Sequence, residues 1–146
     1  MESSSAPTDG PVGKLRPSRR ALLLGVDRYG SEIPPLRNAV RDAQSLGAVL
    51  HDAQGYDVRL LTDEEVTWPN LQRELAAACT PEPPDYFVFY FAGHGITTET
   101  EDGSLGPQGY LIPQDACRKD SKSFWPMRQV LACLRAWDIA DDDPRV

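Results

Sequence analysis

The sequence predicts an α/β fold in which a mostly parallel sheet is flanked by helices. Short apolar runs at 21–26, 57–61 and 86–91 are typical of strands that are buried on both faces. Apolar residues recur at helical spacing between these runs and after the last of them. The order strand, helix, strand, helix, strand implies right-handed crossovers, which place helices on both faces of the sheet.

The first strand is ALLLGV at 21–26, and turn residues follow it. Pro34 and Pro35 then interrupt regular structure. Beyond them, apolar residues recur with the period of a helix: Leu36, Ala39, Val40, Ala43, Leu46 and Leu50. Gly55 lies where the chain must turn at the end of this helix. The pattern predicts an amphipathic helix after the first strand.

The same alternation repeats in the middle of the chain. DVRLL at 57–61 is the second strand, and Thr67 can cap a helix that carries Leu71, Leu75 and Ala78 on one side. The PEPP sequence at 81–84 ends this helix.

The third strand is YFVFYF at 86–91, and a polar loop that contains glycine follows it. GYLIP at 109–113 is a short apolar piece after that loop. Pro126 opens a last helix. Its apolar residues are Met127, Val130, Leu131, Leu134 and Trp137.

Composition limits the kind of protein. The 146 residues suffice for one domain, and residues 1–19, rich in Ser, Pro, Gly and charge, predict a disordered tail before a domain at 20–146. A formal net charge of -7 argues against nucleic acid as a partner. No apolar run approaches the roughly 20 residues that a membrane span needs, so we expect a cytoplasmic protein that does not bind membranes.

Cysteines and histidines give no metal-binding pattern. Cys79, Cys117 and Cys133 show no C-x-x-C spacing, and their odd number suits reduced thiols. His51 and His94 are too far apart in the sequence to share a helix face as ligands. We expect no metal and no cofactor.

His94 is the strongest candidate for chemistry. It follows the third strand in the sequence YFVFYFAGHG, and reactive groups of parallel sheets gather beyond the carboxyl ends of the strands. Gly93 and Gly95 remove side chains on either side, which allows close approach of a substrate. The Gly95 N–H is a donor of the type that stabilises an oxyanion. The alternative is an ordinary surface histidine.

Four segments carry a family resemblance: ALLLGVDRY, LRNAVRDAQSLGAVL, DYFVFYFAGHG and GYLIPQDA. In order and spacing they resemble the amino-terminal half of the caspase-like cysteine peptidases, especially the metacaspases and their bacterial relatives. The resemblance covers about residues 20–137 and implies a caspase-like three-layer sandwich. It also implies a Cys-His dyad with His94 as the histidine and the Gly95 amide as an oxyanion donor.

The nucleophile of such a dyad is missing from this sequence. In caspases the cysteine lies about 50 residues after the histidine, and no cysteine stands near residue 144. The resemblance therefore implies that 20–146 is the amino-terminal portion of a peptidase domain, inactive alone. Its partners would be the portion that carries the cysteine and a protein or peptide substrate.

The three cysteines that are present fit other roles. Cys133 shares helical spacing with Val130 and Trp137, which predicts a small core residue. Cys117 follows the 109–113 segment and is expected to be exposed, and Cys79 ends a helix as a structural residue.

The resemblance also implies a substrate pocket. Metacaspases cut after Arg or Lys, and LRNAVRDA at 36–43 resembles the helix start that supplies their pocket carboxylate, here Asp42. Alternatively, Asp42 is an acidic residue that the helix dipole favours, or Arg37 binds aspartate as in true caspases. Asp27, just past the first strand, is expected to form part of a turn. Asp115 is expected to support the rim of the active site.

Two further hypotheses remain. Calcium activates many metacaspases, but the acidic loop TTETEDGSLG at 97–106 lacks the spacing of a calcium loop, which favours a solvated loop.

The competing function is a catalytically silent caspase-like module that binds or regulates a partner. A receiver or nucleotide-binding domain is disfavoured, because the third strand ends in Ala-Gly-His and no phosphate-binding glycine motif occurs.

Overall fold

A computed structural model describes residues 16–30, 32–99 and 106–139. Most of the expected tail, 1–15, and most of the acidic loop, 100–105, lie outside the described residues. The centre is a parallel sheet of three strands in the order β2-β1-β3. The strands are β1 (Arg19–Gly25), β2 (Asp57–Thr62) and β3 (Tyr86–Ala92). β1 thus begins at the last residue of the segment expected to be tail.

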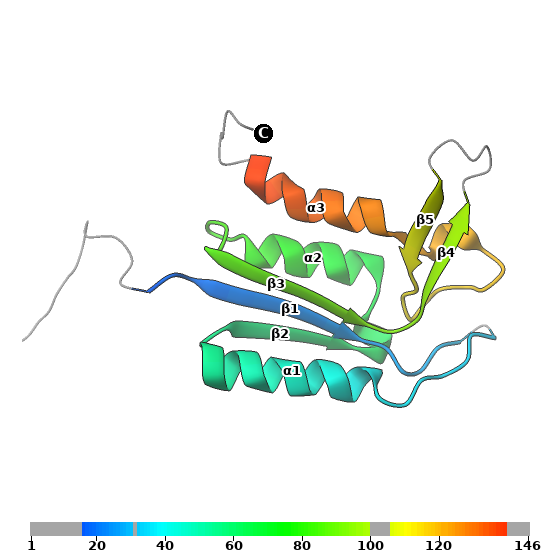
Figure 1. Ribbon diagram of the computed structural model, residues 1–146, viewed down its shortest axis with the longest axis horizontal. Coiled ribbons are helices and arrows are strands. Elements are labelled where there is room, and N and C mark those ends of the chain that lie inside the picture. Colours follow the sequence, from blue (N-terminus) through cyan, green and yellow to red (C-terminus); the bar gives the residue numbers. More distant parts are fainter. Residues whose placement is uncertain (1–15, 31, 100–105, 140–146) are drawn as a thin grey trace, which may run out of the picture.

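Helices cover both faces of this sheet, as the sequence predicted (Figure 1). Helix α1 (Ala39–Gln54) lies on one face, and α2 (Trp68–Ala78) and α3 (Met127–Ile139) lie on the other. The expected α/β fold with a parallel sheet between two helical layers is confirmed. No described helix has the length and apolarity that crossing a membrane requires.

The central strand explains why its sequence is continuously apolar. Leu22 and Leu24 point to the α2 and α3 layer, where they pack with Leu71 and Trp125. Ala21 and Leu23 point to α1 and pack in a second cluster. Alternate residues of β1 therefore belong to different cores, and both sets must be apolar.

Local signals mark the start of α2 and the end of α1 where the sequence suggested. Thr67 accepts a hydrogen bond from the Asn70 N–H at 3.4 Å and caps α2. Gly55 adopts a left-handed φ of 70° after α1. Helix α1 begins at Ala39, later than the apolar pattern, because the chain through Leu36 still belongs to a loop.

A second, antiparallel sheet follows β3, where the sequence predicted a loop and a short apolar piece. It contains β4 (Gly95–Glu99), β5 (Pro107–Leu111) and the short β6 (Trp125–Pro126), in the order β4-β5-β6. The β4 and β5 strands stand away from the parallel sheet (Figure 1). The residues that join the two sheets are Gly93 and His94.

Strand β3 has one open edge within the described part of the chain. It pairs with β1 alone, and it forms one border of the parallel sheet. Six of its seven residues are only partly buried and the first, Tyr86, is exposed, although most of them are aromatic. An aromatic strand with an unpaired edge is a surface on which a further strand can add.

Candidate active site at the carboxyl edge of the sheet

The backbone of His94 is fixed on both sides of its side chain. Its N–H donates to the Tyr29 hydroxyl at 2.9 Å, and its carbonyl accepts from the Ile112 N–H at 3.0 Å. The Tyr29 hydroxyl in turn donates to the Ile112 carbonyl at 2.9 Å. Three residues from distant parts of the sequence therefore hold the junction of the two sheets.

The imidazole of His94 has a defined direction. Its Nε2 lies 2.7 Å from the carbonyl oxygen of Pro34. Because a carbonyl only accepts hydrogen bonds, Nε2 carries the proton, and Nδ1 of the neutral ring is left as the basic nitrogen. No described residue makes a hydrogen bond to Nδ1. The ring is thus held at one nitrogen and available at the other.

Tyr29 and Pro34 both belong to the loop between β1 and α1, which we call the β1–α1 loop (26–38). Asp27 closes this loop, because its carbonyl accepts the Leu36 N–H at 2.8 Å. The Asp27 carboxylate accepts the N–H groups of Ala39 and Val40, at 2.8 and 3.3 Å, at the start of α1. Asp27 therefore has a local structural role, and its carboxylate is engaged by the helix.

Asp63, which sequence reasoning did not single out, holds the base of the same loop. It is buried, follows β2, and accepts the backbone N–H groups of Asp27 and Arg28, each at 2.9 Å. Arg28 also pairs with Glu64, and this hydrogen bond lowers the pKa of the Glu64 carboxyl. The only signal for this arrangement in the sequence was the acidic run after the second strand.

The two glycines beside His94 differ in function. A Cβ at Gly93 would lie 2.7 Å from the Tyr29 hydroxyl oxygen and 2.9 Å from the Phe91 ring, so the site excludes a side chain there. Gly95 pairs with Leu111, and the neighbouring bond from Ile112 N–H to the His94 carbonyl makes this a non-hydrogen-bonded pair. The Gly95 N–H therefore points out of the ladder, and Gly95 itself is exposed.

The expected pocket residues lie at the start of α1. Asp42 is in the first turn of the helix, with an exposed side chain and a backbone N–H that donates to the Asn38 carbonyl at 2.8 Å. Arg37 is exposed in the β1–α1 loop. No contact among the described residues joins either side chain to His94, so the structure groups His94 with Tyr29 and Pro34 but leaves Asp42 separate.

All three cysteines are free thiols that are partly buried. Cys79 caps the end of α2. Its neighbour Ala78 accepts a hydrogen bond from Arg20 at the start of β1, so Cys79 lies at the opposite end of the parallel strands from His94. Burial raises the pKa of the Cys79 thiol, which disfavours a thiolate. Cys133 packs against the core between the sheet and α3, as predicted. Cys117 is partly buried, where the sequence suggested exposure.

Residues 16–30, 32–99 and 106–139 hold no group of three or more His, Cys, Asp or Glu side chains that fits a metal ion. The acidic segment considered for calcium lies for the most part at 100–105, outside the described residues. Its first three residues, Thr97 to Glu99, belong to β4.

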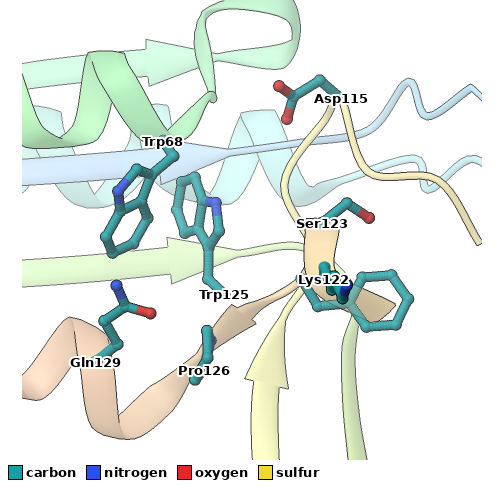
Figure 2. Close-up of a pocket in the computed structure, with 8 residues that line it drawn as sticks. Trp68, Asp115, Lys122, Ser123, Trp125, Pro126 and Gln129 are labelled. Atoms are coloured by element: carbon teal, nitrogen blue, oxygen red, sulfur yellow. The ribbon is translucent and has the colours of Figure 1, made fainter. Parts of the chain in front are cut away.

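A pocket of about 320 Å³ lies on the α2 and α3 side of the sheet (Figure 2). Trp68 and Trp125 form one side, with ring centroids 5.6 Å apart, and Asp115 lies across from them. Trp125 pairs with Leu111, which pairs with Gly95 on its other side. The pocket is thus two strands away from Gly95, and Asp115 borders this pocket.

Comparison with known proteins gives consistent matches. The family model described as "Caspase domain" matches residues 18–136. Metacaspase-1 of Scheffersomyces stipitis is 34% identical over 109 residues, which are 66% of this chain and 27% of that protein. The crystal structure of protein GSU0716 from Geobacter sulfurreducens superposes with a TM-score of 0.66 at 19% identity, covering 81% of this chain and 45% of that one. The chain therefore spans less than half the length of either relative.

Proposed function

The chain belongs to the caspase family, and from the geometry around His94 we propose that it provides the catalytic histidine and an oxyanion donor of a cysteine endopeptidase. The observation that carries the proposal is the hydrogen bond that the ring makes within the described part of the chain. Nε2 is bonded to the Pro34 carbonyl at 2.7 Å, which leaves Nδ1 as the nitrogen that can exchange a proton with a thiol.

The proposed reaction follows from this tautomer. Nδ1 takes the proton of the nucleophilic thiol, and the resulting thiolate attacks the carbonyl carbon of the scissile peptide bond. The imidazolium then gives the proton from Nδ1 to the leaving amine. The Pro34 carbonyl stabilises the charged ring at Nε2 throughout, because it faces the positive charge with its negative end.

Gly95 would stabilise the tetrahedral intermediate. Its N–H points out of the β4–β5 ladder, and Gly95 itself is exposed. Donors that are already in place when negative charge develops typically contribute about 10²-fold to 10³-fold in rate. An exposed amide one residue from the general base meets that requirement.

We propose that the nucleophile is none of the three cysteines described above. Cys79 lies at the opposite end of the strands from His94, Cys133 packs against the core, and no described hydrogen bond joins Cys117 to His94. The open edge of β3 offers a place for the missing element, since a strand added there in parallel would end beside His94. Residues 1–146 alone would then have no turnover.

Asp42 supports a preference for cleavage after Arg or Lys. Its exposed carboxylate has no partner among the described side chains. Asp42 lies in the first turn of α1, and this end of the helix is on the same side of the molecule as the carboxyl ends of the parallel strands (Figure 1). A carboxylate in this position can bind a guanidinium or ammonium group of the substrate. Protein or peptide chains with basic residues are therefore the proposed substrates.

The test compares the two histidines of the chain in the full-length protein. His94→Ala should abolish cleavage of peptides with Arg or Lys before the scissile bond. His51→Ala should retain it, because His51 is exposed on α1, where it pairs with Asp52. Alkylation of thiols should also abolish cleavage.

Each alternative outcome has a clear meaning. Cleavage by the His94→Ala protein would remove His94 from the mechanism. A full-length protein that cleaves no peptide, yet binds another protein through this domain, would establish the catalytically silent module instead.

A further inference from the structure

We propose that Tyr29 is the positioning residue for His94, acting through its hydroxyl group rather than through contact with substrate. This inference rests on the proposed role of His94 in catalysis. Its structural part, that the hydroxyl fixes the imidazole, can be tested without any measurement of cleavage.

The hydroxyl of Tyr29 completes a closed circuit of hydrogen bonds. It accepts from the His94 N–H at 2.9 Å and donates to the Ile112 carbonyl at 2.9 Å. The circuit closes through the Ile112 N–H, which donates to the His94 carbonyl at 3.0 Å. A hydroxyl is suited to this place because it donates and accepts at once, whereas a phenylalanine ring would do neither.

The hydroxyl keeps its proton under ordinary conditions. Burial raises the pKa of Tyr29 to about 12, so the group remains a donor to Ile112 at neutral pH. The aromatic ring of Tyr29 also lies beside the imidazole, with centroids 5.0 Å apart and planes inclined by 50°. The same side chain therefore restrains the backbone and the ring of His94.

Gly93 provides independent support for this assignment. A Cβ at position 93 would stand 2.7 Å from the Tyr29 hydroxyl oxygen, closer than real Cβ contacts come. The residue before His94 must therefore lack a side chain if the hydroxyl is to reach the His94 N–H. This explains one of the two glycines in the Gly-His-Gly sequence, while the exposed Gly95 serves the oxyanion.

The two described hydrogen bonds between His94 and the β1–α1 loop depend on the same segment. Tyr29 binds the backbone, and the Pro34 carbonyl binds Nε2. If the hydroxyl is removed, the His94 backbone loses its link to this loop, and the bond from Nε2 to Pro34 loses its geometric support. A shift of the ring affects the chemical step more than substrate binding, because the scissile bond is approached by Nδ1.

The experiment uses NMR on Tyr29→Phe, with Tyr56→Phe as the matched control. Tyr56 is another partly buried tyrosine, and it packs against the cluster of Ala21, Leu23 and Ala43 on the α1 face of the sheet. In the wild type, the nitrogen shifts of the His94 ring should show the neutral form protonated at Nε2. In Tyr29→Phe we expect a mixture of both tautomers and exchange of the His94 amide hydrogen about 10-fold faster, as the amide loses its acceptor.

A second measurement needs no variant. In the wild type, a nuclear Overhauser effect between the Tyr29 hydroxyl proton and the His94 amide proton is expected. Absence of this signal, or an unchanged tautomer and unchanged amide exchange in Tyr29→Phe, would overturn the positioning role.

Activity separates this inference from the proposed function. In a full-length protein that cleaves peptides, Tyr29→Phe should lower kcat about 10-fold with little change in KM, and Tyr56→Phe should change neither. If the NMR changes occur but the wild type cleaves nothing, the peptidase proposal fails while the positioning role stands. If the wild type cleaves and Tyr29→Phe has the same kcat, the positioning role fails alone.

Discussion

The buried carboxylate of Asp63 accepts the backbone N–H of Asp27 at 2.9 Å and joins the ends of two neighbouring parallel strands. The same oxygen accepts the N–H of Arg28, also at 2.9 Å. Asp63 reaches this position with a left-handed φ of 45°. The base of the β1–α1 loop is thus held by one side chain from the end of β2.

Replacing Asp63 by alanine should destabilise the protein by about 2–4 kcal/mol, since two partly buried N–H groups lose their acceptor and an alanine at this φ is strained. Asp63→Asn is the control, because asparagine keeps an acceptor oxygen and tolerates the left-handed region. Unfolding in urea, followed by circular dichroism, measures both free energies. Equal stability of the alanine variant and the wild type would show that water replaces the carboxylate at no cost.

Gly25 should not tolerate a side chain. A Cβ there would lie 2.9 Å from both the Ala39 carbonyl oxygen and the Val40 Cα, which are backbone atoms of α1. Because the helix itself must shift, Gly25→Ala should lower the free energy of unfolding by about 1–3 kcal/mol.

The matched control for this substitution is Gly30→Ala in the β1–α1 loop. A Cβ at Gly30 meets no atom within 4 Å, so its effect should stay within about 0.5 kcal/mol. Thermal unfolding of the two variants side by side gives the comparison. If both glycines tolerate alanine equally, α1 packs less tightly on β1 than the structure indicates.

Stability should fall at high pH through Tyr29. Burial raises the pKa of this hydroxyl from 10.0 to about 12, so the folded protein retains a proton that the unfolded chain loses. The contribution is complete below pH 10 and is lost as the pH rises from 10 through 12. The slope stays below the limit of about 1.4 kcal/mol per pH unit for one proton, because solvent screens this partly exposed hydroxyl.

The measurement compares wild type and Tyr29→Phe. The difference between their free energies of unfolding should be constant below pH 10 and then shrink toward pH 12, because the remaining tyrosines contribute equally to both proteins. A difference that is independent of pH would mean that the Tyr29 hydroxyl ionises as readily in the folded protein as in the unfolded chain.

Asp42 should determine substrate preference if it supplies the pocket carboxylate. In the full-length protein, Asp42→Asn should lower kcat/KM for substrates with Arg or Lys before the scissile bond by about 10²-fold or more, as one partner of a charge-assisted contact is lost. Asp52→Asn is the control, since Asp52 is exposed at the other end of α1. An unchanged preference in Asp42→Asn would assign recognition of the basic residue to another part of the protein.

The parallel sheet was predictable because burial on both faces leaves a strong mark on the sequence. β1 has apolar residues at consecutive positions, and α2 has both a Thr67 cap and apolar residues on one side. The β4–β5 pair has no such apolar pattern in its sequence. All five residues of β4 are exposed, so the strand exists through pairing with β5 and not through an apolar pattern of its own.

The candidate site was predictable only in part, for a similar reason. His94 stood out because two glycines flank it at the end of a strand. Tyr29 did not, since a single tyrosine in a turn has no periodic signal and its function depends on Ile112, 83 positions later in the chain. The buried Asp63 was hidden within an ordinary acidic run, because its partners are the backbone N–H groups of Asp27 and Arg28, about 35 positions earlier in the chain.

The acceptor for His94 Nε2 is the carbonyl oxygen of Pro34, an atom that every amino acid carries. Exchanging the residue at position 34 therefore leaves the acceptor in the protein, and alanine scanning would pass over the group that sets the tautomer of the imidazole. Insertions or deletions that reroute the backbone between β1 and α1 are the changes to which this hydrogen bond is sensitive. For this hydrogen bond, the length of the loop is a more informative variable than the side chain at position 34.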